Sequence, residues 1–139
     1  MSGLTIDAIS MHFELPGGGG VQALKDVSLH LDEGELLSVL GPSGCGKTTL
    51  LNILAGFLVP TEGRIKLHDK VVSGPGPDRG MVFQQGALFE WMNVRKNIAF
   101  GPDMLGRPKG ETKDKVDHLL ETVGLHDFGD KMIYELSGG

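Results

Sequence analysis

The chain has 139 residues, 40% hydrophobic and 22% charged, which suits one globular domain with a single core. Its formal net charge of −5 argues against nucleic acid or anionic lipid as the main partner. One cysteine excludes an intrachain disulfide, and no apolar run approaches the roughly 20 residues of a membrane span. The first seven residues lack the basic and apolar parts of a signal peptide. These features indicate a cytoplasmic protein.

The N-terminal third of the chain predicts β-structure. Residues 4–15 have extended character and lead into a proline and four glycines, residues 16–20, which predict a flexible hairpin tip. Residues 23–31 resume as a strand. A turn at residues 32–34 then leads to residues 35–40, whose apolar run predicts a buried strand.

A glycine-rich segment follows this apolar run and fits the phosphate-loop pattern G-x-x-x-x-G-K-[ST] at every fixed position. Its residues are Gly41, Pro42, Ser43, Gly44, Cys45, Gly46, Lys47 and Thr48. Glycines let several backbone N–H groups point into one concavity at the positive end of the following helix, where a polyphosphate binds. Residues 47–58 predict that helix, and because it is apolar nearly all round we expect it to be packed inside a core. The segment predicts binding of a nucleoside triphosphate.

Further strands and helices complete the pattern. Residues 64–68 predict a short strand and residues 81–84 a buried one, and residues 94–100 predict a short helix that ends at the breaker Gly101-Pro102. The clearest amphipathic helix is predicted over residues 112–123 and stops at a glycine; its apolar face consists of Val116, Leu119, Leu120 and Val123. Strands alternating with helices around a phosphate loop predict an α/β nucleotide-binding core.

Four landmarks in order resemble the nucleotide-binding subunit of ATP-binding cassette (ABC) transporters. They are the phosphate loop, the segment Val82-Phe83-Gln84, residues 93–101, and the terminal run Leu136, Ser137, Gly138, Gly139. The resemblance implies an α/β P-loop NTPase core with an antiparallel β subdomain over residues 1–84, and the start of a helical subdomain over residues 85–139. Because the chain ends at the last landmark, we expect the fold to be incomplete and the chain to be a fragment.

The same resemblance implies roles for individual residues. Phe13 would stack on adenine, with an ordinary edge or core Phe as the alternative. Lys47 would contact the β- and γ-phosphates, and Thr48 and Gln84 would hold Mg²⁺, Gln84 also meeting the attacking water; Gln85 is the less favoured alternative. ATP would be bound by residues 41–48 together with Thr49. The terminal run would cap the γ-phosphate of ATP held by a second subunit.

Residues 87–101 are similar to importers of nitrate, sulfonate and taurine type, although Glu90 stands where that branch more usually has Pro. Phe89 and Trp91 form either an apolar knob for a membrane subunit or part of the core. The resemblance implies ATP hydrolysis driving uptake at the cytoplasmic face of the inner membrane.

The implied partners are permease subunits, a second ATP-binding subunit in a homodimer and, indirectly, a periplasmic or extracellular substrate-binding protein; no nucleic acid is expected. The Mg²⁺-holding Asp, the catalytic Glu and the switch His of the family lie downstream of the signature, so we expect this chain alone to be inactive. The alternatives are an inactive nucleotide-binding fragment and a cassette ATPase outside transport.

Overall fold

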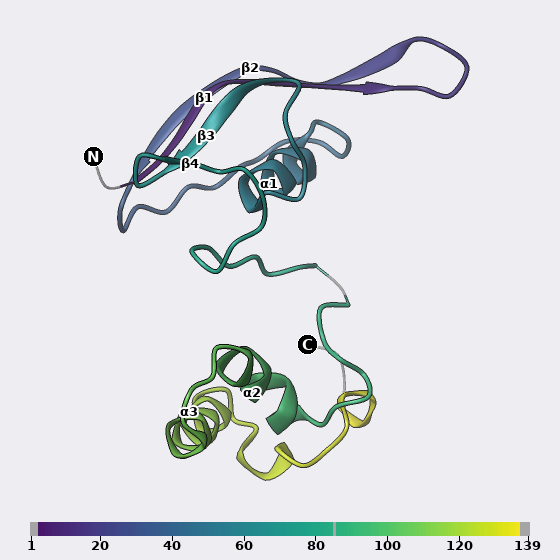
Figure 1. Cartoon of the computed structure of the whole chain (residues 1–139). Helices are drawn as coiled ribbons and strands as arrows, with labels where there is room; N and C mark the ends of the chain where they lie inside the picture. The colour runs from purple at the N-terminus through teal and green to yellow at the C-terminus, as the bar shows by residue number, and fades with distance from the viewer. Residues whose placement is uncertain (1–2, 85, 137–139) are drawn as a thin grey trace. The chain divides into compact units, whose positions relative to one another are not determined.

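The computed structural model describes residues 3–84 and 86–136. The chain forms two compact units, one over residues 1–81 and one over residues 82–139. The first carries a sheet and the helix α1 (Lys47–Ala55), and the second is helical (Figure 1). Each unit has its own cluster of buried apolar side chains, and each is described by itself. The assignment of an ATP-binding core to residues 1–84 and a helical subdomain to residues 85–139 stays a prediction.

The first unit is built on a four-stranded antiparallel sheet. Its strands follow the order β2-β1-β3-β4, and they are β1 (Gly3–Glu14), β2 (Gly20–Asp32), β3 (Glu62–Leu67) and β4 (Lys70–Val71). The long hairpin of β1 and β2 turns where Leu15 donates its N–H to the Gly19 carbonyl at 3.0 Å, which confirms the predicted glycine tip. Figure 1 shows this hairpin running on beyond α1.

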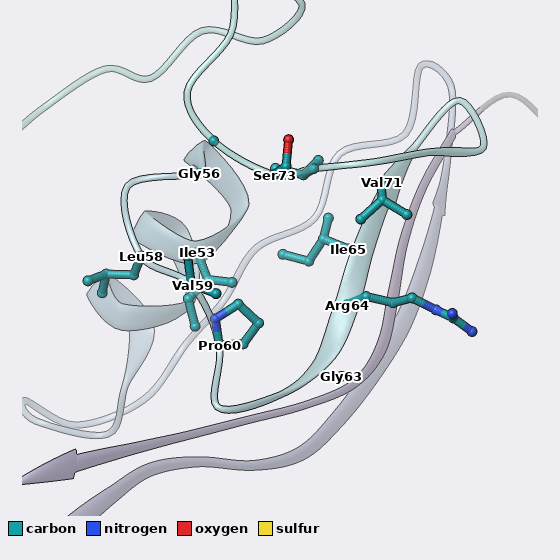
Figure 2. A pocket seen from close by; sticks show the side chains of 12 residues that line it. Ile53, Gly56, Leu58, Val59, Pro60, Gly63, Arg64, Ile65, Val71 and Ser73 are labelled. Carbon is teal, nitrogen blue, oxygen red and sulfur yellow. The ribbon is translucent and has the colours of Figure 1, made fainter.

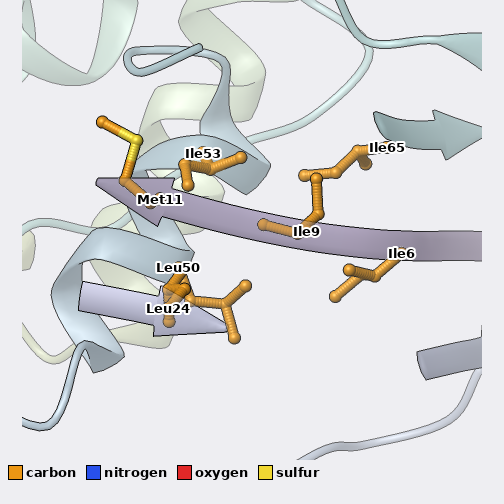
Figure 3. Close-up of a cluster of buried hydrophobic side chains, with 7 residues drawn as sticks. All are labelled: Ile6, Ile9, Met11, Leu24, Leu50, Ile53 and Ile65. Atoms are coloured by element: carbon orange, nitrogen blue, oxygen red, sulfur yellow. The ribbon is translucent and has the colours of Figure 1, made fainter. Parts of the chain in front are cut away.

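The helix α1 packs one of its faces on this sheet. Leu50 and Ile53 of the helix join a buried cluster whose other members are Ile6, Ile9, Met11, Leu24 and Ile65 (Figure 3). The opposite face is open, with Leu51 49% exposed. The prediction of a helix buried all round is therefore wrong, because a single sheet covers only one side of it.

Two predicted buried strands are absent among the described residues. Residues 35–40 and 81–84 have no regular structure, and Leu36, Leu40 and Val82 are 94%, 89% and 98% exposed. A strand needs a neighbour to satisfy its N–H and C=O groups. No strand of the described sheet pairs with either segment, so their apolar composition does not produce a strand.

The second unit joins two helices and two short 3-10 turns. These elements are α2 (Val94–Met104), α3 (Lys109–Thr122), η1 (His126–Phe128) and η2 (Ile133–Glu135). The helix α2 runs through Gly101 and Pro102, so the predicted break there is wrong. Pro102 has a φ that suits a helix and lies near the C-terminal end of α2, which continues for only two residues beyond it. The turn then closes through the N–H of Leu105, which donates to the Gly101 carbonyl at 3.1 Å.

The helix α3 confirms the predicted amphipathic element but buries a narrower face. Val116 and Leu120 are each 1% exposed and pack with Val94, whereas Leu119 is 37% and Val123 62% exposed. The i, i+4 pair therefore faces α2, and the other two apolar positions do not. Gly124 follows the helix with a φ of 72°, which confirms the predicted stop.

The architecture combines an antiparallel sheet with helices and is α/β in class, as predicted. No helix among the described residues is long and apolar enough to cross a membrane.

Candidate functional site

The phosphate loop forms a tight turn directly before α1. Gly44 and Gly46 have φ values of 80° and 95°, a region that glycine enters without steric cost. Leu50 donates its N–H to the Gly46 carbonyl at 2.9 Å, and the N–H groups that precede it in the first turn have no acceptor within the helix. That turn contains no acidic residue. The head of α1 therefore offers backbone donors and positive potential without a carboxylate to repel an anion.

The loop is seated on β2 through its last glycine. A Cβ on Gly46 would lie 2.5 Å from the Ala23 carbonyl oxygen and 2.9 Å from Cδ2 of Leu24. Only a residue without a side chain fits this approach. The sequence motif identifies Gly46 but does not predict its contacts with Ala23 and Leu24, because these contacts depend on how α1 packs on the sheet.

The Lys47 side chain folds back over the loop. Its Nζ donates to the carbonyl oxygens of Gly41 at 2.6 Å and Pro42 at 2.7 Å, and it lies 3.5 Å from Sγ of Cys45. Two neutral carbonyls hold an ammonium group less strongly than a polyphosphate would. An anion that enters the loop can therefore displace the two carbonyls as the partner of this ammonium. This arrangement is compatible with the nucleoside triphosphate that the motif predicts.

The other loop residues lie at the surface or are half-buried. Cys45 donates its N–H to the Pro42 carbonyl at 3.4 Å and is exposed. Thr48 is exposed in the first turn of α1, and Thr49 next to it is half-buried. A hydroxyl oxygen is a ligand type that Mg²⁺ accepts, and the role of Thr48 at this ion stays a prediction.

Phe13 lies on β1 close to this site in the sheet register. It pairs with Val21 of β2, two residues from Ala23, the contact of Gly46. Two residues of a strand span roughly 6.8 Å. The Phe13 ring is 37% exposed, so it is not a core residue, and its predicted contact with a base stays a prediction.

The remaining predicted site residues belong to the second unit. Gln84 is exposed, without helix or strand, and its role at Mg²⁺ stays a prediction. Leu136 packs on the cluster of Val116 and Leu120. Gln85 and the residues Ser137, Gly138 and Gly139 lie outside the described part of the chain. Over residues 3–84 and 86–136 no group of His, Cys, Asp and Glu could hold a metal.

Trp91 is 73% exposed, and Phe89 is half-buried beneath it with ring centroids 5.2 Å apart. The sequence left two alternatives for these residues, an exposed apolar knob or part of the core. For Trp91 the prediction of a core position is wrong. Its docking on a membrane subunit stays a prediction.

Charged groups of the second unit form a surface network. The hydrogen bond from Arg95 lowers the pKa of the Asp117 carboxyl below its ordinary value and raises that of the guanidinium itself. The hydrogen bond with Asp127 raises the pKa of His126. The Arg95–Asp117 pair joins α2 to α3.

Comparison with known proteins places this geometry in a family. The family model described as ABC transporter matches residues 24–139. The chain is 68% identical over all 139 residues to the Taurine import ATP-binding protein TauB of Ruegeria pomeroyi and 48% identical to the protein of that name from Pseudomonas aeruginosa, covering 52% of each. It is also 47% identical over 136 residues to an uncharacterized ABC transporter ATP-binding protein of Methanocaldococcus jannaschii, of which it covers 51%. The chain therefore spans about half the length of these curated relatives.

Solved structures agree with the family match. A dimeric post-hydrolysis ATP-binding cassette bound to ADP and Pi superposes with a TM-score of 0.81 at 26% identity, over 96% of this chain and 63% of that one. A dimeric bacterial ABC transporter cassette gives 0.84 at 27% identity, over 97% and 63%. On the match over residues 24–139 and the phosphate loop at the head of α1, the chain belongs to the ABC transporter family.

Proposed function

We propose that this chain is the ATP-binding part of an ABC importer ATPase whose imported substrate is taurine. The observation that carries the nucleotide part is the Lys47 ammonium, held over the loop by the Gly41 and Pro42 carbonyls at 2.6 and 2.7 Å. The 68% identity to a taurine import ATP-binding protein over the whole chain supports the substrate. It favours taurine over nitrate and other sulfonates.

ATP binding begins with an exchange of partners at Lys47. The ammonium leaves the two neutral carbonyls and pairs with the negatively charged β- and γ-phosphates, so that both partners of each hydrogen bond carry a charge. The N–H groups at the head of α1 donate to the same phosphates. The Thr48 hydroxyl would supply one oxygen ligand to Mg²⁺, and the Phe13 ring would stack on the adenine base.

In ATP hydrolysis the protein positions the γ-phosphoryl group and stabilises the charge that develops on it, since ATP itself supplies the transferable group. Lys47 neutralises charge that builds up on the γ-phosphate, and the loop amides hold the β-phosphate still. Gln84 orients the water in this proposal, and residues 136–139 cap the γ-phosphate of a second subunit. Thr48 and Gln84 are the residues that would hold Mg²⁺ in this proposal, through a hydroxyl and an amide oxygen.

The working assembly in this proposal contains two copies of the ATP-binding subunit and a membrane permease. The two solved relatives named above are dimeric, which supports the pairing of copies. A substrate-binding protein would deliver taurine from outside, and the ATP-binding subunits would lie at the cytoplasmic face of the inner membrane.

Titration with MgATP tests the nucleotide part. We expect the Lys47→Ala variant to lose at least tenfold in affinity by calorimetry, because the ammonium-to-phosphate pair is removed. Lys25→Ala is the matched control: it removes the same charge from an exposed position of β2 and should leave the affinity unchanged. Equal affinities of wild type and Lys47→Ala would contradict the proposal.

Growth and uptake test the substrate. We expect cells in which the gene is deleted to lose ATP-dependent uptake of radiolabelled taurine and to regain it with the wild-type gene but not with Lys47→Ala. Retained taurine uptake, together with loss of nitrate uptake, would contradict the choice of taurine and leave ATP binding standing.

A further inference from the structure

The second unit contains a cavity of about 450 Å³ where α2 ends and α3 begins. This α2–α3 cavity is lined by Gly101, Pro102, Leu105, Arg107, Glu111, Thr112 and Lys115. Its volume falls within the range of about 300–1,000 Å³ that is typical of small-molecule sites. The first unit holds a smaller cavity of about 260 Å³ with mostly apolar walls, in which the charged residue Arg64 already pairs with Asp7 at 3.1 Å (Figure 2). The α2–α3 cavity is therefore the better candidate for a polar ligand.

The turn between the two helices has a fixed backbone. Leu105 donates its N–H to the Gly101 carbonyl at 3.1 Å, and Arg107 donates its N–H to the Pro102 carbonyl at 3.0 Å. Gly106 lies between them with a φ of 66°, a conformation that glycine adopts without steric cost. The turn therefore brings the C-terminal end of α2 and the N-terminal end of α3 to the same cavity.

These two helix ends have opposite polarity. The N-terminal end of α3 carries a partial positive charge and the C-terminal end of α2 a partial negative charge. No side chain among the described residues caps α3, and Thr112 is the first of its residues to donate a helical bond, to the Pro108 carbonyl at 3.0 Å. The N–H groups of residues 109–111 thus have no acceptor within the helix. Such an end attracts an anion.

Thr112 provides a second, independent indication of a ligand. It lies in the wall of the cavity and is 6% exposed, and its Oγ1 has no hydrogen-bond partner within residues 3–84 and 86–136. A buried hydroxyl that lacks a partner carries a desolvation cost. An oxygen of a ligand in the cavity can accept the hydrogen of this hydroxyl and remove that cost.

The charged side chains of the cavity have both signs and are unpaired. Arg107, Glu111 and Lys115 are exposed, and none of them forms an ion pair with another residue that the structure describes. Glu111 and Lys115 have the i, i+4 spacing that favours a pair on a helix, yet no such pair forms. Two cationic groups and one carboxylate at a single cavity suit a ligand that itself carries both charges.

We propose that the α2–α3 cavity binds a small zwitterion with an oxyanion at one end and an ammonium group at the other, such as taurine. The oxyanion lies at the N-terminal end of α3 and accepts hydrogen bonds from Arg107, Lys115 and the Thr112 hydroxyl. The ammonium group lies between Glu111 and the C-terminal end of α2, which both attract a cation. Leu105 contacts the short apolar linker. The choice of taurine rests on the proposed function, whereas the charge pattern of the cavity does not.

Calorimetric titration with taurine and with ethanesulfonate tests the zwitterion, because ethanesulfonate keeps the sulfonate but lacks the ammonium group. We expect the wild type to bind taurine at least about fivefold more tightly. Glu111→Gln should abolish this preference. Glu121→Gln is the matched control, since it makes the same change at an exposed position of the same helix, and it should keep the preference. No binding of taurine, or an undiminished preference in Glu111→Gln, would overturn the proposal.

Two further variants test the groups that hold the oxyanion. We expect Arg107→Gln to weaken taurine binding about tenfold, since it removes a charge-assisted bond. Thr112→Val keeps the shape of the side chain and should weaken binding about threefold through the lost hydroxyl. The matched control is Thr122→Val on the same helix, where the hydroxyl donates to the His118 carbonyl at 2.8 Å, and its affinity should stay that of the wild type. Unchanged affinity in both Arg107→Gln and Thr112→Val would contradict the site.

Lys47→Ala separates this site from the proposed function. The variant should lose affinity for MgATP and keep the wild-type affinity for taurine, because Lys47 belongs to the phosphate loop of the first unit. Loss of taurine binding in Lys47→Ala would assign taurine to the phosphate loop and overturn the α2–α3 site. A wild type that binds taurine as expected but does not bind MgATP would contradict the proposed function alone.

Discussion

Gly46 and Ala23 join the phosphate loop to the sheet: a Cβ on Gly46 would stand 2.5 Å from the Ala23 carbonyl oxygen. No side chain can occupy that space without moving either β2 or the head of α1. The glycine also has a φ of 95°, so the position combines a steric limit with a backbone conformation that other residues rarely adopt.

Gly46→Ala should therefore destabilise the first unit and impair nucleotide binding together. We expect a loss of about 2–4 kcal/mol in the free energy of unfolding, from left-handed strain and from the displaced carbonyl. Urea unfolding followed by circular dichroism measures it. Gly34→Ala is the control: its φ is 86° with no atom within 4 Å of the new Cβ, so strain alone should cost about 1–2 kcal/mol. Equal losses would contradict the steric argument.

Bound nucleotide should protect Cys45 from alkylation. Cys45 is exposed, and its Sγ lies 3.5 Å from the Lys47 Nζ, within the loop that we propose binds the phosphates. We expect MgATP to slow the reaction with iodoacetamide, measured by mass spectrometry, and adenosine, which lacks phosphates, to leave it unchanged. The same alkylation rate with and without MgATP would mean that the phosphates bind elsewhere.

The Asp117–Arg95 pair should make the second unit less stable in acid. The hydrogen bond from Arg95 lowers the folded pKa of Asp117, so the folded state binds its proton less readily than the unfolded state. The resulting stabilisation is fully present above the unfolded pKa of about 3.9 and is lost as the pH falls through the lower, folded pKa.

Asp117→Asn should accordingly lower the urea midpoint of unfolding at pH 6. It should leave the midpoint unchanged at a pH below the folded pKa of Asp117, where the wild-type carboxyl is protonated as well. The control is Asp114→Asn on the exposed side of α3, which should leave the midpoint unchanged at both pH values. A pH-independent loss in Asp117→Asn would show that the pair acts through packing rather than charge.

Leu120 and Leu119 provide a test of the buried face of α3. Leu120 is 1% exposed and Leu119 is 37% exposed. We expect Leu120→Ala to cost about 2–5 kcal/mol through lost burial and a cavity. Leu119→Ala should cost less than about 1 kcal/mol. Urea unfolding measures both. Comparable losses would mean that α3 buries a wider face than the structure shows.

The sequence determined the features that depend on local geometry. The hairpin tip at residues 16–20 follows from its proline and glycines, and the loop at residues 41–48 follows from a fixed spacing of glycines before a helix. Gly124 ends α3 because a glycine readily adopts the left-handed conformation of a helix C-terminus. In these segments the residue types determine the local backbone conformation, so the sequence pattern is sufficient to predict it.

Tertiary structure decided the features that depend on a distant partner. The apolar residues 35–40 form no strand because no neighbour in the described sheet pairs with them. The helix α1 buries one face because one sheet covers it. The contact of Gly46 with Ala23 joins segments whose proximity no local pattern predicts. Burial and hydrogen bonding are properties of pairs, and the sequence alone does not specify which pairs form.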